Sequence, residues 1–161
     1  MTEFGFQTSP PDRLAGVRPS TAAVWLNMSD WMAYNLSRVK SVAQYELFDE
    51  LNRGAFQTGL RYHNGRAKPL LAAYRTPIWV VRRHGRTMIW GQVRGGGTKD
   101  RVQLRYQPRR HGKWRRWKTV RPNSHGFLRV RTRRGAYRWK LYWTDSTGHL
   151  RASRSARPAS H

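Results

Sequence analysis

The sequence contains no cysteine, and this one absence excludes several chemistries. Such a chain forms no disulfide bond, offers no thiolate to a metal ion and has no cysteine nucleophile. The histidines show none of the spacings that are typical of metal ligands. We therefore expect neither a metal nor another cofactor. The six histidines are residues 63, 84, 111, 125, 149 and 161.

Long apolar runs are missing as well. No stretch approaches the ~20 apolar residues that a membrane-spanning helix needs, so we expect no membrane partner. Where a secretory signal peptide would place its apolar segment, the chain has Glu3 and the pair Pro10-Pro11. The sequence thus predicts no signal peptide, and it leaves the compartment of this chain open.

Acidic residues are scarce, and the scarcity is confined to one half of the chain. Residues 1–76 contain nine Lys or Arg against six Asp or Glu, whereas residues 77–161 contain 23 against two. The break at Thr76-Pro77 predicts two units of different character. A hydrophobic content of 38%, with eight Trp, is enough for a packed core, so we do not expect global disorder.

The first half alternates strand-like and helix-like segments. Six apolar residues between Val24 and Leu36 recur at helical spacing, which predicts an amphipathic helix with Ser20 as its N-cap. The other expected elements are a strand end at residues 1–6, a strand at 39–49, a hairpin turn at Asn64-Gly65 and a helix at 68–75 with Pro69 in its first turn.

After Pro77 the apolar pattern changes to a period of two. Short alternating runs, separated by Gly, Asn, Pro and Asp, predict an all-β antiparallel, immunoglobulin-like sandwich over residues 78–150. A basic flexible tail is expected over residues 151–161. The expected strands are 87–93, 101–107, 114–120, 127–133, 136–143 and 149–155, and the glycine-rich segment 94–100 is expected to be a hairpin turn.

Three stretches of the chain together resemble one enzyme family. They read TEFGFQTSPPD (2–12), VKSVAQYELFDE (39–50) and FQTGLRYHNGRAKPLLAAYRTPIWV (56–80). Their order and spacing are similar to the carboxyl-terminal part of clan-A glycoside hydrolases, the cellulase-type (β/α)8 enzymes found in actinobacteria. In that family a Thr-Glu-aromatic-Gly motif ends the seventh strand, and a V-x-S-x-x-Q pattern marks the eighth. Members often append a small β-sandwich, which the second half loosely resembles.

The resemblance implies an α+β chain whose residues 1–77 are a truncated (β/α)8-barrel remnant. It implies that Glu3 ends the seventh strand, beside residues 39–48, and is the catalytic nucleophile of a retaining β-glycosidase. For the parent family the location is extracellular, and the partner is a polysaccharide or oligosaccharide.

The family's second catalytic carboxyl group is expected to be missing. Retaining enzymes need a general acid/base as well as a nucleophile. In the family this Glu lies on the fourth strand, and neither Asp49 nor Glu50 matches it. We therefore expect a carboxyl-terminal fragment that is inactive alone. We also expect it to expose strand edges and an apolar helix face, and so to aggregate readily.

Two other functions fit the second half. Trp114 and Trp117 are candidates for stacking on sugar rings, and their spacing places them on opposite faces of a strand, so that one should be exposed. The excess positive charge predicts salt-dependent binding of polyanions, including nucleic acid. Alternatively, the arginines simply fill the solvated faces of the sandwich. Trp139 and Trp143 share a strand face with other apolar residues, which favours core packing for them.

Overall fold

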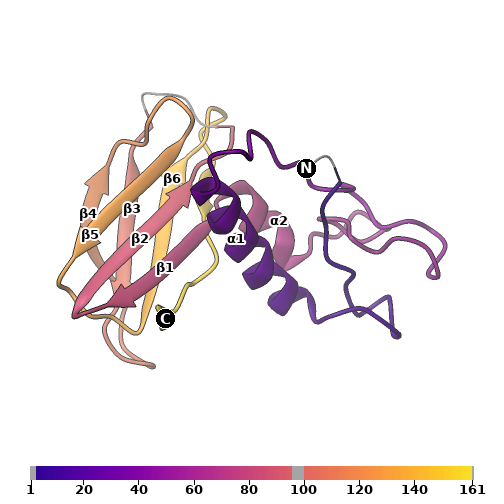
Figure 1. Ribbon diagram of the computed structural model, residues 1–161, viewed down its shortest axis with the longest axis horizontal. Helices are drawn as coiled ribbons and strands as arrows, with labels where there is room; N and C mark the ends of the chain where they lie inside the picture. The colour runs from indigo at the N-terminus through magenta and orange to yellow at the C-terminus, as the bar shows by residue number, and fades with distance from the viewer. Residues whose placement is uncertain (1–2, 96–99, 161) are drawn as a thin grey trace. The chain divides into compact units, whose positions relative to one another are not determined.

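A computed structural model describes residues 3–95 and 100–160, and the chain divides into two compact units (Figure 1). The units are Met1–Tyr74 and Arg75–His161, so the division falls a few residues before the boundary predicted at residue 77. Each unit has its own cluster of buried apolar side chains. Each is described by itself below.

The first unit contains two helices, α1 (Pro19–Asn35) and α2 (Pro69–Arg75), as the apolar spacing predicts. The strand predicted at residues 39–49 is wrong, because within this segment only two isolated parallel bridges form, Phe4–Gln44 and Phe48–Arg61. A barrel remnant is therefore not shown. Residues 39–49 are held mainly by contacts with side chains and loops of this unit. Ladders of backbone hydrogen bonds contribute little.

The helix α1 buries a different face from the predicted one. Its cap residue is Arg18, followed by Pro19, and no side chain caps it, so the prediction of Ser20 as N-cap is wrong. Val24 and Leu36, at the two ends of the predicted stripe, are 37% and 56% exposed. The buried face combines small and polar side chains, namely Ala22, Ala23, Leu26, Asn27 and Asp30.

A polar contact explains why this face of α1 is the buried one. The Asn27 side-chain amide donates a hydrogen bond of 2.9 Å to the Ala73 carbonyl oxygen near the end of α2. Ala22 and Ala23 are small enough to allow close approach, and Ala22 and Ala73 are fully buried. Because apolar spacing alone does not register small residues or amide contacts, the sequence pattern favoured the wrong face.

The turn at Asn64-Gly65 is confirmed. Gly65 has a φ of +82°, in the left-handed region that glycine adopts without strain. Tyr62 donates to the Arg66 carbonyl at 2.9 Å, and Arg61 and Ala67 form an antiparallel bridge. This turn leads directly into α2.

The second unit consists of two four-stranded sheets. One has the order β5-β2-β1-β8 and the other β4-β3-β6-β7, and all pairs except β1–β8 are antiparallel. The arrangement is compatible with the predicted β-sandwich. The strands are β1 (Ile78–Arg83), β2 (Arg86–Gln92), β3 (Val102–Gln107), β4 (Arg115–Val120), β5 (Phe127–Thr132), β6 (Arg138–Thr144), β7 (Leu150–Ala152) and β8 (Ala159–Ser160).

Three predictions about this unit need correction. The sequence pattern missed β1, because its apolar residues form a continuous run rather than an alternating one. The segment 94–100 was predicted to be a hairpin turn, but the strands before and after it, β2 and β3, belong to different sheets and do not pair; residues 96–99 lie outside the described residues. The tail is not free either: β7 pairs with β6, and Ala159 and Ser160 pair with β1.

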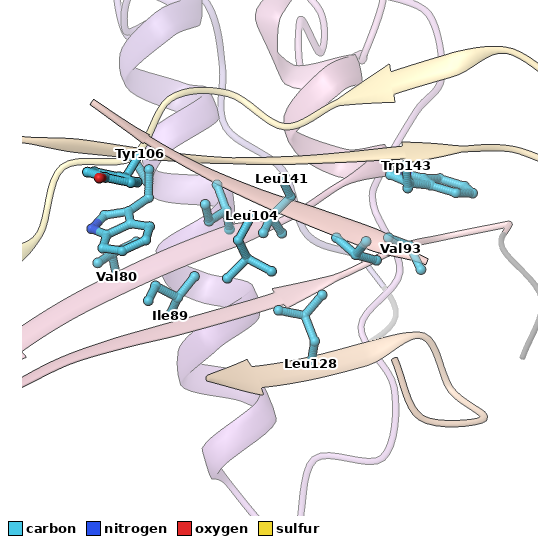
Figure 2. Packing of buried hydrophobic residues seen from close by; sticks show 12 residues of the cluster. Val80, Ile89, Val93, Leu104, Tyr106, Leu128, Leu141 and Trp143 are labelled. Atoms are coloured by element: carbon cyan, nitrogen blue, oxygen red, sulfur yellow. The ribbon is translucent and has the colours of Figure 1, made fainter. Parts of the chain in front are cut away.

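Side chains from both sheets form one core in the second unit (Figure 2). Ile89 and Leu128 come from the first sheet, and Leu104 and Leu141 from the second. Gly91 allows the close approach of this packing, since a Cβ there would lie 2.4 Å from Leu141 Cδ1. Trp139 and Trp143 are buried in the core, which confirms that they pack rather than bind.

Candidate functional site

The structure places Glu3 next to residues 44–46. Glu3 is exposed and directly precedes Phe4, whose carbonyl oxygen accepts a 2.8 Å hydrogen bond from the Tyr45 amide. Phe4 and Gln44 form a parallel bridge. Glu3 therefore lies beside the segment that the resemblance predicts, although a single bridge joins the two segments where paired strands were expected.

Close packing fixes the backbone around this bridge. A Cβ on Gly5 would lie 2.8 Å from Thr58 Cβ, so only glycine fits without displacement. The Gln44 amide nitrogen donates to the carbonyl oxygens of Tyr45 (2.8 Å) and Thr58 (2.9 Å). Residues 4–5, 44–45 and 58 are thus tied together, and they hold Glu3 at the margin of this packed group.

Other carboxyl groups gather around the same residues. The pKa of the Tyr45 hydroxyl is raised, first by partial burial and then by the negative charges of Glu46, Glu3 and Glu50. Glu3, Glu46 and Glu50 therefore all lie within electrostatic range of the Tyr45 hydroxyl. Sequence reasoning considered Asp49 and Glu50 but missed Glu46.

Glu46 has the most unusual environment of this group. Burial raises its pKa, a hydrogen bond and the charge of Glu50 act in the same direction, and a hydrogen bond from Thr58 opposes them. Its Oε2 lies 3.1 Å from the Thr58 hydroxyl. The backbone of Glu46 has a φ of +72°, which is uncommon for a residue other than glycine and is frequent at functional sites. No residue pattern in the sequence signals this conformation.

A buried ion pair supports the loop next to these carboxyl groups. The Lys68 ammonium group donates to Asp49 Oδ1 in a short contact, to the Thr8 hydroxyl at 2.6 Å and to the Gln57 carbonyl at 3.2 Å. Asp49 Oδ1 also accepts from the Gly59 amide at 3.0 Å. Burial lowers the pKa of Lys68. Every proton of this ammonium group has an acceptor, so Lys68 holds the loops together and is not a candidate nucleophile.

The two candidate sugar-binding tryptophans lie on opposite faces of their sheet, as their spacing predicts. Trp117 contacts buried Trp139 edge-to-face, with ring centroids 5.2 Å apart, and belongs to the core. The Lys140 ammonium group lies 5.6 Å from the Trp114 ring centroid, on the face away from the core. Both rings are half-buried, so the prediction that one of them is exposed is wrong, and they cannot form one flat platform.

The described residues do not form a metal centre. Within residues 3–95 and 100–160, no group of three or more His, Asp or Glu side chains is arranged to hold a metal ion. No helix in the same part of the chain has both the length and the apolar character that crossing a membrane requires.

Comparison with known proteins identifies no family for this chain. No family model matches the chain, and no curated protein matches it. The functional argument therefore depends on the residues and contacts described above.

Proposed function

We propose that the first unit carries the nucleophile side of a retaining β-glycosidase, with Glu3 as the attacking carboxylate. The observation that supports this most is the position of Glu3, exposed and beside the Phe4–Gln44 bridge. Neighbouring parallel strands of a barrel would bring the same two segments together. The motifs around Glu3, Gln44 and Lys68 are those on which the family resemblance rests.

The chemistry of such a site needs two carboxyl groups in different protonation states. The ionised one attacks the anomeric carbon, and the protonated one donates to the leaving oxygen. Glu46 is a carboxyl group whose environment favours the protonated form, which is the state that a general acid requires. The acid/base Glu of the family has no counterpart in this chain, so we expect no sustained hydrolysis of ordinary glycosides by this chain alone.

A substrate with a very good leaving group separates the nucleophile from the acid. In a 2,4-dinitrophenyl 2-deoxy-2-fluoro-β-glycoside, dinitrophenolate departs with its electron pair and needs no proton. The Glu3 carboxylate then forms a bond to the anomeric carbon as the bond to the phenolate oxygen breaks. The electron-withdrawing fluorine slows hydrolysis of the resulting ester, so the adduct accumulates.

The expected result is one fluoroglycosyl group on the amino-terminal peptide, detected by mass spectrometry, and none on Glu3→Gln. Asp12→Asn is the matched control: it also converts a carboxylate to an amide, and its oxygen can still accept from Leu14 and Ala15. Glucosides, mannosides and galactosides are tested in parallel. A folded protein that acquires no label, or a label that persists in Glu3→Gln, would falsify the proposal.

We propose in addition that the second unit is an immunoglobulin-like sandwich. The strand order supports this, since β1, β2 and β5 lie in one sheet while β3, β4, β6 and β7 lie in the other. Chains of this class change sheets repeatedly in the same way. The added β8 extends the first sheet at its β1 edge.

A further inference from the structure

The outer face of the sheet β4-β3-β6-β7 carries a row of positive charges. Arg105 on β3 lies opposite Arg116 on β4 and opposite Lys140 on β6. Adjacent strands are ~4.8 Å apart, so the three cations stand side by side across the sheet. They point away from the core, because their neighbours Leu104 and Leu141 are fully buried. We call Arg105, Arg116 and Lys140 the cationic row.

Carboxylates do not neutralise this row. Like charges directly opposite each other destabilise a sheet. In the described part of the chain, no Asp or Glu forms an ion pair with any member of the row. One of the two acidic residues of this unit, Asp145, is engaged elsewhere: it accepts from Arg151 Nε at 2.6 Å in the turn before β7.

Aromatic rings contact two of the three cations of the row. The Arg105 guanidinium carbon lies 4.5 Å from the Tyr142 ring centroid, and Arg105 Nε donates to the Gln103 side chain in a short contact. The Lys140 ammonium group lies 5.8 Å from the Tyr142 centroid and 5.6 Å from that of Trp114. These contacts orient two of the three charges, and each places a cation against a ring on which a nucleic-acid base could otherwise stack.

We propose that the cationic row binds an acidic polysaccharide, one that carries a carboxylate or sulfate on successive sugars. Charge complementarity requires a polyanion, and the occupied ring faces disfavour single-stranded nucleic acid. Arginine forms paired hydrogen bonds with carboxylates and sulfates, which suits two of the three positions. A row that crosses three neighbouring strands also suits an extended chain. This binding does not depend on the glycosidase activity of the first unit.

The test compares two triple variants with the same change in net charge. Arg105→Gln, Arg116→Gln and Lys140→Gln remove the cationic row. Arg83→Gln, Arg86→Gln and Arg131→Gln remove three exposed cations from the other sheet. Binding is measured by titration of the full chain with polygalacturonate and with a neutral glucan of similar length, at several salt concentrations. The same titrations are made with single-stranded and duplex oligonucleotides that carry the same charge as the polygalacturonate.

We expect the row variant to bind polygalacturonate at least tenfold more weakly and its salt slope to fall by about two to three, since each lost contact removes about one released counterion. The control variant should lose less than threefold. Equal losses in the two variants would show attraction by net charge alone and overturn the site. Oligonucleotides that bind more tightly than polygalacturonate would overturn the choice of partner. Because the row faces solvent and its like charges repel one another, both variants should melt at no lower temperature than the parent protein, which is checked first.

Discussion

The two units of this chain keep their structure in different ways. The second unit depends on sheet ladders around one apolar core, with 24 basic and two acidic residues that point mainly outward. The first unit has no extended strand among its described residues and eight basic residues against six acidic ones. It is held by side-chain contacts such as the Lys68–Asp49 pair. Backbone pairing holds the second unit together although most of its charges are positive, whereas the buried pair of the first unit requires one charge of each sign.

Exposed apolar side chains reveal a second difference between the units. Among the residues that the structure describes, ten of the eleven large exposed apolar side chains belong to the first unit, for example Trp25, Leu51 and Phe56, and only Leu150 belongs to the second. Large exposed apolar areas mark surfaces that bind partners or aggregate. The first unit therefore exposes more apolar side chains than the second, and Val24, Trp25 and Met32 among them belong to the helix stripe predicted from the sequence.

The largest effect should come from Lys68→Met, which leaves the Asp49 carboxylate buried without its cation. Breaking a buried pair in this way costs about 3–5 kcal/mol, enough to unfold a small unit. We expect the amide NMR signals of residues 3–74 to lose their dispersion while those of residues 75–160 stay in place. Lys40→Met, at an exposed lysine of the same unit, is the control and should leave both sets of signals unchanged.

A double variant distinguishes the charge from the packing. Lys68→Met combined with Asp49→Leu removes both charges together, so it should recover part of the loss. If Lys68→Met alone melts within one degree of the parent protein, the buried pair does not hold the first unit, and the contrast drawn above is wrong.

A smaller effect is expected in the second unit from Gly91→Ala. The new Cβ would lie 2.4 Å from Leu141 Cδ1 and 2.9 Å from the Pro77 carbonyl oxygen, so the Leu141 side chain and the backbone at Pro77 must move. Overpacking of this kind costs about 1–3 kcal/mol. Urea unfolding of the second unit measures it. Gly112→Ala is the matched control, because the nearest atoms to its new Cβ, those of the Arg109 backbone, are 3.5 Å away. An unchanged midpoint for Gly91→Ala would show that the core is looser than the contacts indicate.

The smallest effect concerns pH and is confined to the first unit. The pKa of Glu46 is raised above its ordinary value of 4.5, so the folded state holds the proton more tightly than the unfolded state does. The stability that this group contributes is complete below pH ~4.5 and is lost as pH rises through the folded pKa. Glu46→Gln should flatten this decline. Urea titrations from pH 4 to pH 8, followed by signals of each unit, provide the measurement. A decline of the same size in the second unit would exclude Glu46 as its origin.

The parts of the fold that could be predicted are the elements that a local residue pattern is enough to specify. The alternating runs located five of the sandwich strands to within two residues, and Pro69 and Asn64-Gly65 marked the second helix and its preceding turn. The contacts that determine the structure of the first unit do not follow from local patterns. The Asn27–Ala73 hydrogen bond, the left-handed backbone of Glu46 and the burial of Lys68 all join residues that are distant in sequence or depend on local conformation. The position of Glu3 beside residue 44 was anticipated through motifs alone.

The place of β4 at the edge of its sheet has a consequence for self-association. Its exposed residues Arg115, Arg116 and Lys118 would meet their own copies if two molecules joined these edges, and this mutual repulsion opposes such pairing. Dissolved salt screens repulsion between exposed charges over about 8–10 Å at ordinary ionic strength. Joining of molecules through β4 should thus become easier as salt is added, whereas capture of a polyanion on the same sheet should become harder.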